Sequence, residues 1–402
     1  MNVAEMALAL DGLHDEMVAT RRDLHRHPEL GFQEVRTAGI VVDRLTRSGL
    51  RVRSGVAETG VLALVQGGLP GPAVLVRADF DALPVQERND LPFRSQVDGR
   101  MHACGHDGHT AIGLAVAQVL HQHRATLPGA VQFAFQPAEE MISGAKPMIE
   151  QGALDDPPID ATLSFHLTTE LPVGQVAVRS GPLMASADRF ELLVRGSGGH
   201  GAYPHRSVDA ITIACEIVAA LQTLVAREVA AVDAAVISFG TFQAGTAFNI
   251  LPPEARLSGT LRALEPALRS RLTARIGEVS RGIATAMRAE AEVTFHAGCP
   301  PVVNDPGITE LVRGASRNVV GAEATVEGVQ HMGADDASYF LEARPGCYFF
   351  VGAADPARGF GGPHHSPEFR IDEASLPIAA QVLLRSIVNV LQGSQTNDGG
   401  RA

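Results

Sequence analysis

The sequence predicts an α/β protein in which a complete ferredoxin-like α+β domain is inserted into a larger sheet domain. Strands alternate with helices along both outer segments, which is typical of a sheet covered by helices. The middle segment has the order β-α-β-β-α-β. At 402 residues the chain is too long for one compact core. We expect the larger domain at 1–186 and 299–402, and the inserted domain at 187–298.

The elements of the first segment follow from apolar runs and the breaks between them. A glycine- and proline-rich stretch at 67–72 predicts a loop between two strands. Helical spacing or apolar runs predict helices at 37–47 and 111–123, and strands at 61–66, 73–78, 130–135 and 161–165.

The inserted domain has its own set of elements. Pro266 stands at a favoured first-turn position and opens the longer of its two helices. Strands are predicted at 189–195, 235–243, 255–264 and 292–296, and helices at 208–225 and 267–287. The larger domain then resumes and ends in a helix at 374–391, and we expect disorder at 397–402.

Composition describes an ordinary soluble globular chain, with 45% hydrophobic and 19% charged residues. The formal net charge of −12 argues against nucleic acid or an anionic membrane as a partner, because both attract basic surfaces. The four cysteines are far apart, which favours a reducing compartment. The first residues do not look like a signal peptide, and no apolar run has the length of a membrane span. We therefore expect a cytoplasmic protein.

The stretch at 101–110 reads Met-His-Ala-Cys-Gly-His-Asp-Gly-His-Thr. It places the thiol of Cys104 and the imidazole of His106 one residue apart. Thiolate and imidazole together are the ligands that borderline divalent cations select. The alternative is a lone buried cysteine beside surface histidines.

Two adjacent carboxylates, Glu139 and Glu140, follow an apolar strand and a proline. Neighbouring side chains on an extended segment diverge, so one glutamate can bind a cation while the other faces a water molecule. Metal-assisted hydrolysis needs that division, because the second carboxylate takes the proton of the water. A solvated acidic turn is the alternative.

Further candidate ligands stand at other predicted strand ends or in loops. His166 ends an apolar strand, and His364 and His365 lie together in a loop. Asp79 and Asp81 follow a strand on one face, where they suit the orientation of ligands. Each residue alone fits a structural role, but their coincidence at strand ends favours a metal site.

Nine short motifs carry a resemblance that runs over nearly the whole chain. They lie at 22–31, 77–84, 101–109, 136–140, 199–205, 249–252, 259–262, 332–336 and 365–369. With these motifs the chain resembles the M20 metallopeptidase family, in its amidohydrolase branch of hippurate, N-acyl-amino-acid and plant auxin-conjugate hydrolases. The Cys-Gly-His-Asp-Gly-His stretch is the most specific. The resemblance implies a mixed-sheet metallopeptidase catalytic domain with an inserted lid and dimerisation domain.

The resemblance also implies two divalent metal ions per subunit, which would be zinc, manganese, cobalt or nickel. Where commoner members of the family have a histidine this chain has Arg77, and the replacement ligand is then His106. The histidine directly before Ser-Pro, His365, is preferred to His364. The positions that match the family's metal ligands are Cys104 (as the bridge), His106, Glu140, His166 and His365.

Further roles are implied by the same motifs. Glu139 matches the general base, and His200 the residue that stabilises the tetrahedral oxyanion. Asn249 and Arg262 match groups that hold a substrate carboxylate. A flexible loop position for His200 and a plain strand-end charge for Arg262 remain alternatives. Together with Asp79 and Asp81, Asp107 is expected to orient the ligands.

The expected function is therefore metal-dependent hydrolysis of the amide bond of a small N-acyl amino acid, with Glu139 as general base. A homodimer or higher homo-oligomer through the inserted domain is expected. A dipeptidase or carboxypeptidase of the same fold is the first alternative. A non-catalytic protein with Cys104 as a redox-sensitive thiol is the second, and it leaves the other candidate ligands without a purpose.

Overall fold

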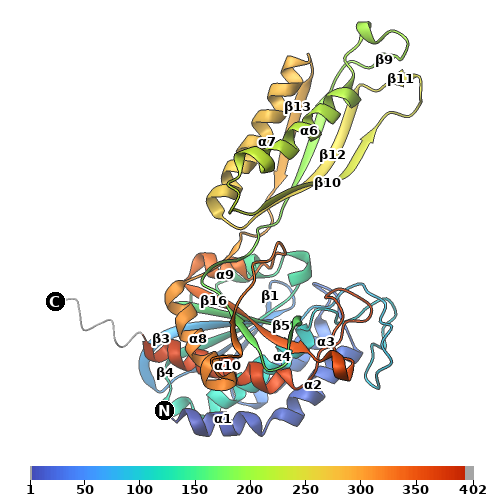
Figure 1. Ribbon diagram of the computed structural model, residues 1–402. Helices are drawn as coiled ribbons and strands as arrows, with labels where there is room; N and C mark the ends of the chain where they lie inside the picture. The colour runs from blue at the N-terminus through green and yellow to red at the C-terminus, as the bar shows by residue number, and fades with distance from the viewer. Residues whose placement is uncertain (1, 394–402) are drawn as a thin grey trace, which may run out of the picture. The chain divides into compact units, whose positions relative to one another are not determined.

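The protein is described here as a computed structural model that covers residues 2–393 (Figure 1). The tail at 397–402, for which the sequence predicts disorder, lies outside the described residues. The chain divides into a larger unit of Met1–Leu183, Val303–Val329 and Asp335–Ala402 and a smaller unit of Met184–Val302 and Gln330–Ala334. Gln330–Ala334 groups with the smaller unit because Ala185 donates its backbone N–H to His331 and Gly333.

The larger unit is built on a mixed eight-stranded sheet, which confirms the predicted α/β class. The strand order is β1-β2-β4-β3-β5-β16-β6-β15, and β4, β3, β5 and β16 run parallel in its centre. Every residue of β4 and β16 is buried, as expected for strands covered on both faces. The bounds are β1 Arg51–Val56, β2 Gly60–Gln66, β3 Leu69–Asp79, β4 Pro128–Gln136, β5 Ala161–Pro172, β6 Val176–Val178, β15 Thr325–Glu327 and β16 Gly346–Ala354.

Helices of this unit pack on the parallel strands. Both α4 and α10 contact β3 and β5, and α8 lies beside α10 (Figure 1). Asp305 caps α8 by accepting the N–H of Ile308, and Pro306 opens its first turn. The bounds are α1 Val3–Asp11, α2 His14–Arg26, α3 Val35–Arg47, α4 His106–Gln122, α5 Ala145–Glu150, α8 Pro306–Val320, α9 Ser338–Ala343 and α10 Ser375–Gly393.

Three predicted boundaries in this unit need correction. Helix α4 begins at His106, not at residue 111, because Gly105 makes the turn into it with a φ of 96°. Strand β5 continues past His166 to Pro172, since it keeps its pairing with β16 as far as Ala354. Strand β3 begins at Leu69, inside the stretch that was predicted to be a loop.

The smaller unit has the predicted β-α-β-β-α-β order. Its antiparallel sheet has the order β10-β12-β8-β13, and α6 and α7 lie side by side against it (Figure 1). The bounds are β8 Asp188–Arg195, β9 Gly199–His200, α6 Ala210–Glu228, β10 Ala235–Ala244, β11 Ile250–Leu251, β12 Glu254–Ala263, α7 Pro266–Ala286 and β13 Glu290–His296. Strands β7 Gly181–Met184 and β14 Val302–Asn304, most of whose residues belong to the larger unit, pair with each other.

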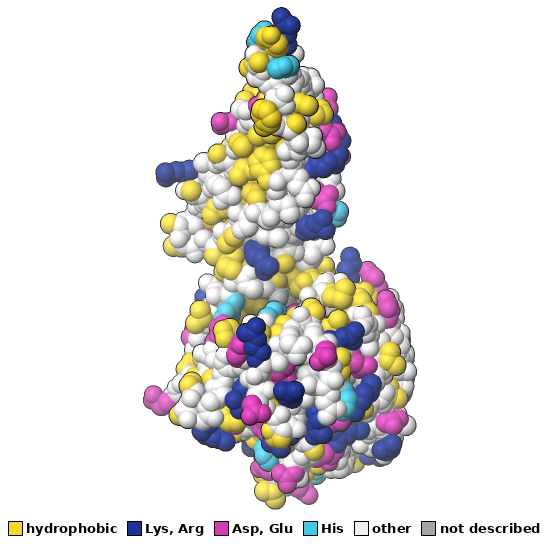
Figure 2. Space-filling view, turned by 90° about the vertical axis from the view of Figure 1, so that its right-hand side faces the viewer, with side chains coloured by type: hydrophobic (Ala, Val, Ile, Leu, Met, Phe, Trp, Pro, Cys, Tyr) yellow, Lys and Arg dark blue, Asp and Glu magenta, His cyan; other side chains and the backbone are white. Residues whose placement is uncertain are grey.

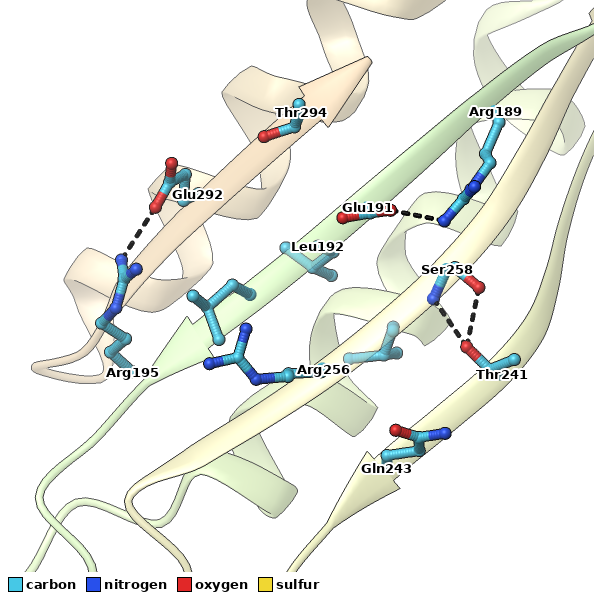
Figure 3. Close-up of a pocket in the computed structure, with 12 residues that line it drawn as sticks. Arg189, Glu191, Leu192, Arg195, Thr241, Gln243, Arg256, Ser258, Glu292 and Thr294 are labelled. Atoms are coloured by element: carbon cyan, nitrogen blue, oxygen red, sulfur yellow. Dashed lines mark hydrogen bonds and ion pairs between the residues drawn. The ribbon is translucent and has the colours of Figure 1, made fainter. Parts of the chain in front are cut away.

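The sheet of the smaller unit also lines an open groove of about 380 Å³. Figure 3 shows the groove crossed by charged side chains from β8, β12 and β13. Its arginines are paired, since Arg189 contacts Glu191 at 2.5 Å and Arg195 contacts Glu292 at 2.9 Å. These two arginines are thus paired with acids of the same sheet.

Two helices, α6 and α10, are long and apolar enough to span a membrane by length and composition. This differs from the sequence expectation that no such run exists. Both helices also meet the needs of core packing. In α10, 67% of the apolar stretch is buried inside the larger unit. In α6, Ile213, Ile217 and Leu221 pack into the core of the smaller unit. The two helices are therefore weak evidence for a membrane.

Candidate active site

The candidate site of the larger unit lies where the parallel strands end. Asp79 is the last residue of β3 and pairs with Gln136, the last residue of β4. The pairing of β3 with β5 ends at Ser164, two residues before His166. The carboxyl ends of parallel strands form one edge of a sheet, and loops that carry ligands meet there.

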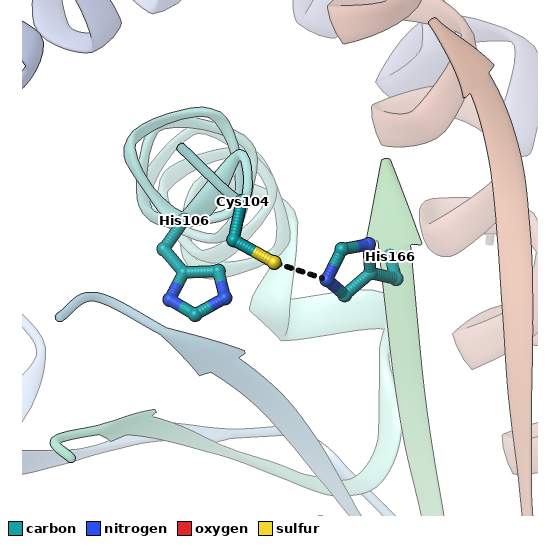
Figure 4. Close-up of side chains that lie close together, drawn as sticks. All are labelled: Cys104, His106 and His166. Atoms are coloured by element: carbon teal, nitrogen blue, oxygen red, sulfur yellow. Dashed lines mark hydrogen bonds between the residues drawn. The ribbon is translucent and has the colours of Figure 1, made fainter. Parts of the chain in front are cut away.

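The Cys104–His106 segment enters this edge just before α4. The left-handed conformation of Gly105 lets both neighbouring side chains reach the same cluster as His166 (Figure 4). The Sγ atom of Cys104 lies 3.4 Å from Nε2 of His166. All three side chains are buried, so their polar atoms must find partners inside the protein.

Two of these histidines are held in a tautomer that suits a ligand. The Nδ1 atom of His106 donates to the backbone oxygen of Asp81 at 2.9 Å. The Nδ1 atom of His166 donates to the backbone oxygen of Leu167 at 2.7 Å. Each bond places a proton on Nδ1, so that the lone pair of the neutral ring stands on Nε2, which is how proteins orient histidine ligands.

The two neighbouring glutamates come from a short loop after β4. Ala138 turns the chain with a φ of 51°, and a 3-10 turn then spans Glu139–Met141. The carboxylate of Glu139 lies 3.8 Å and that of Glu140 3.9 Å from Nε2 of His106. Glu140 Oε2 also lies 3.3 Å from Nε2 of His365. The two carboxylates therefore face the same cluster but meet different neighbours.

Both histidines of the 364–365 pair reach the cluster. The backbone N–H of His365 donates to the oxygen of Ala103, which fixes this loop beside Cys104. His364 Nδ1 lies 3.6 Å from Cys104 Sγ. The sequence offered both histidines as candidates, and the family resemblance preferred His365 to His364.

The donor atoms fit a divalent cation. Three groups of three among the predicted ligands and Glu139 have donor atoms within 4.8 Å of one another; they are Cys104 with His106 and His166, Cys104 with Glu140 and His365, and His106 with Glu139 and Glu140. Tetrahedral coordination of zinc by sulfur and nitrogen separates the two donors by about 3.6 Å. Buried Nε2 of His106 and Oε1 of Glu140 have no hydrogen-bond partner among the described residues. These orphaned atoms are what a bound ion would satisfy.

The aspartates divide into two sets. Asp79 holds His109 at 2.5 Å and lies 3.4 Å from His106 Nε2. Asp81 accepts the backbone N–H of Glu140 at 3.1 Å. Asp107 instead turns to α2, where it binds Arg21 at 2.9 Å and His25 at 2.8 Å. Those contacts join α2 to the start of α4.

Electrostatics reflects the excess of buried acid. Burial opposes a charged imidazole at His106, but Asp79 and Asp81 outweigh it and raise the pKa of His106 to about 10. Burial, with the nearby Glu140, raises the pKa of the Cys104 thiol well above its usual value. Burial, with Asp335, likewise raises the pKa of Glu139. Protons held by these three side chains offset the negative charge of the buried carboxylates. A divalent cation bound at the cluster would replace such protons.

The remaining predicted residues belong to the smaller unit. Strand β9 pairs with β11, which places His200 opposite Ile250, and the backbone oxygen of Asn249 accepts the N–H of Gly201. Nδ1 of His200 accepts the N–H of Ala202 at 3.1 Å. Arg262 Nη1 donates to the backbone oxygen of Met332 at 2.9 Å. His200 and Asn249 thus lie close together at one end of this unit.

A mixed α/β unit with buried thiol, imidazole and carboxylate donors at its strand ends defines a metal-dependent hydrolase. A family model described as Peptidase family M20/M25/M40 matches residues 75–389. The chain belongs to this family.

The relatives of this chain narrow its class of hydrolase to one that cleaves amide bonds. The chain is 43% identical to a Bacillus subtilis protein named as an amidohydrolase, YhaA, over 96% of this chain and 98% of that one. It is 39% identical to N-acetylcysteine deacetylase of the same organism, over 96% and 99%. It is also 39% identical to IAA-amino acid hydrolase ILR1-like 2 of Arabidopsis thaliana, over 94% and 86%. The chain is an amide-hydrolysing enzyme of the M20 family.

A solved structure agrees with the fold. A dinuclear metal-binding peptidase of family M20 from Bacillus subtilis superposes with a TM-score of 0.83 at 36% identity, over 95% of this chain and 99% of that one. The family therefore includes dinuclear metal sites.

Proposed function

We propose that this enzyme hydrolyses the amide bond of small N-acyl amino acids at a site of two divalent ions held by the larger unit. The residues that would hold them are Cys104, which matches the family's bridging ligand, and the other four that match the family pattern: His106, Glu140, His166 and His365. Bound there, the ions would lower the pKa of a water molecule and polarise the amide carbonyl.

Glu139 is the general base of this proposal. It takes the proton from the attacking water and passes it to the departing amine. Its support is the division of labour in the loop after β4. Both glutamates lie near His106, but Glu140 contacts His365, whereas Glu139 lies near Asp335 and Asp336. A buried carboxylate whose pKa is raised can hold the proton between the two steps.

Residues of the smaller unit complete the proposed mechanism. Because Nδ1 of His200 accepts a hydrogen bond, its proton stands on Nε2, which can donate to a developing oxyanion. Asn249 and Arg262 would hold the α-carboxylate of the substrate. Arg262 has further N–H donors beyond the one that binds Met332.

The observation that carries the proposal is the pair of adjacent glutamates facing one cluster of thiol and imidazole donors. The test is a panel of N-acetyl and N-benzoyl amino acids beside dipeptides with the same C-terminal residue. Each is assayed with zinc, manganese, cobalt and nickel in turn. We expect kcat/KM for the N-acyl substrates to exceed that for the dipeptides at least tenfold.

The outcomes of this panel separate the alternatives. A preference for dipeptides would instead assign the enzyme as a dipeptidase or carboxypeptidase. If the protein binds no metal and cleaves no amide, the result favours the second alternative, a non-catalytic protein with Cys104 as a redox-sensitive thiol. Glu139→Gln, purified in parallel, controls for contaminating hydrolases.

The proposal includes a homodimer or higher homo-oligomer through the smaller unit. Strand β10 stands at the end of its sheet, so one of its edges has no strand partner among residues 2–393. Val236 and Phe242 on this strand are exposed, and Figure 2 shows hydrophobic side chains gathered on a face of this unit. Free edges and apolar patches mark association surfaces. Light scattering of the wild type and of Phe242→Lys tests this association. A monomeric wild type would contradict the proposed oligomer.

A cytoplasmic location is the last part of the proposal. All four cysteines are free thiols, as a reducing compartment would keep them. Fractionation of cells that express the protein tests the location, and recovery outside the cytoplasm would refute it.

A further inference from the structure

A cluster of buried acids lies behind the proposed base. Oxygen atoms of Glu139, Asp335 and Asp336 come within 4.8 Å of one another. Asp335 and Asp336 end a sequence motif, residues 332–336, to which the proposed function gives no role. Three such carboxylates suggest a further cation at first sight.

The donors around the two aspartates argue against a cation. Asp335 accepts both terminal nitrogens of Arg77, at 2.9 and 3.2 Å, and the hydroxyl of Tyr348 at 2.8 Å. Asp336 Oδ1 accepts Nε2 of Gln136 at 2.5 Å. Its Oδ2 accepts the backbone N–H groups of Gly144 and Ala145, each at 2.9 Å. Every oxygen atom of the two aspartates already accepts a hydrogen bond.

Those bonds close the loop that carries the two glutamates. Gln136 ends β4 before this loop, and Gly144 and Ala145 follow it, so Asp336 joins its two ends. A Cβ at Gly144 would lie 1.7 Å from the backbone oxygen of Pro137, which shows how closely the ends approach. The loop between them holds its left-handed turns at Ala138 and Ile142.

Arg77 anchors this arrangement. Its Nε donates to Gln136 Oε1 at 2.9 Å, and its Nη1 lies 2.7 Å from Asp79 Oδ2. The guanidinium is fully buried and meets carboxylates on two sides. One arginine therefore joins Asp79, which contacts His106, to the residues that close the glutamate loop.

We propose that Asp336 is a positioning residue for the general base, closing the loop of Glu139 and Glu140 by bonds to Gln136, Gly144 and Ala145, with Arg77 and Asp335 as its anchor. The inference rests on the proposed role of Glu139. Asp336 touches no reacting atom, so it acts on turnover through the placement of Glu139.

The test exploits the direction of one hydrogen bond. In Asp336→Asn the amide oxygen still accepts Gly144 and Ala145, but the amide nitrogen then faces the amide nitrogen of Gln136. We expect kcat to fall about 10- to 100-fold, as for other residues that orient a catalytic group. KM should change less than about threefold, and both ions should remain bound by elemental analysis.

Adding Gln136→Glu to Asp336→Asn restores the pairing and the total charge. The new carboxylate accepts from the asparagine and from Nε of Arg77. We expect the double variant to recover kcat to within about threefold of wild type, a rescue that loss of general stability does not predict. Amide exchange at Gly144 and Ala145 in the metal-free protein should speed up in Asp336→Asn and slow again in the double variant. Asp305→Asn, at the cap of α8, is the matched control and should keep wild-type kcat.

The outcomes separate this inference from the proposed function. In a Glu139→Gln background Asp336→Asn should cause no further loss, because its effect passes through that residue. If Glu139→Gln loses turnover while Asp336→Asn keeps it, the inference is wrong and the base assignment stands. If Glu139→Gln keeps turnover, the base assignment itself fails. Should Asp336→Asn not fold, the double variant decides alone, and a loss beyond about 30-fold there would overturn the inference.

Discussion

Nδ1 of His106 donates a hydrogen bond to the backbone oxygen of Asp81 at 2.9 Å, which turns its free Nε2 toward Glu139 and Glu140. The same aspartate accepts the backbone N–H of Glu140 through its side chain. Asp81 thus fixes a histidine and a glutamate relative to each other before any cation binds. A site ordered in this way needs little rearrangement to take up metal.

Cys104→Ser should weaken metal binding about 10- to 100-fold, because the thiolate is the softest donor in the cluster. Isothermal titration with zinc or manganese, with elemental analysis after dialysis, measures the change. Cys215→Ser is the control, since that cysteine is exposed on α6 of the smaller unit. Equal affinity in Cys104→Ser and wild type would remove Cys104 from the ligand set.

Metal should stabilise the larger unit. At a free concentration of 100 times its dissociation constant, an ion that binds only the folded protein adds about 2.7 kcal/mol to the free energy of unfolding. Thermal or denaturant unfolding of chelator-treated protein, with and without added zinc, measures this gain. This gain in the free energy of unfolding should be smaller in Glu140→Gln. No gain in wild type at millimolar metal would speak against a resident ion.

Asp107→Asn should cost about 3 kcal/mol of folding free energy, because it leaves the buried Arg21 and His25 without their shared carboxylate. Denaturant unfolding measures the loss. The matched control is Asp43→Asn, which removes an exposed ion pair with Arg47 and should change stability by less than about 1 kcal/mol. Equal effects of the two substitutions would show that Asp107 does not join α2 to α4.

Glu34 should make stability depend on pH. Burial raises the pKa of Glu34 to about 6 from a usual value of 4.5. The folded state therefore binds this proton more tightly than the unfolded state, and stability is lost as pH rises through that interval. Glu34→Gln has no such proton to lose. Between pH 4 and pH 7 wild type should lose about 2 kcal/mol relative to the variant, as measured by urea unfolding. Parallel pH profiles would contradict the assignment.

Much of the fold could be predicted because its signals are local. Continuous apolar runs predicted β4 and β2, and Pro266 predicted the start of α7. The start of α4 could not be predicted, because the helix begins inside the cluster at His106 through the left-handed turn of Gly105. The extension of β5 past His166 depends on pairing with β16, a strand from far along the chain.

In the candidate site, too, contacts between distant parts of the chain could not be predicted from the sequence. Cys104, His106 and Glu140 could be proposed from spacing and from the resemblance to known hydrolases. The approach of His364 to Cys104 could not, because it depends on how the 364–365 loop is bonded to Ala103. The bonds that Asp336 makes across the glutamate loop were also hidden, since they join residues that are nearly 200 positions apart. Tertiary contacts of this kind leave no periodic trace in a sequence.

The most direct test of the central claim compares Glu139→Gln with Glu140→Gln for metal content and for turnover of an N-acetyl amino acid. If Glu139 moves the proton and Glu140 holds the cation, Glu139→Gln keeps both ions and loses at least about 10²- to 10⁴-fold in kcat, whereas Glu140→Gln loses metal. A Glu139→Gln enzyme with both ions and wild-type kcat would contradict the account.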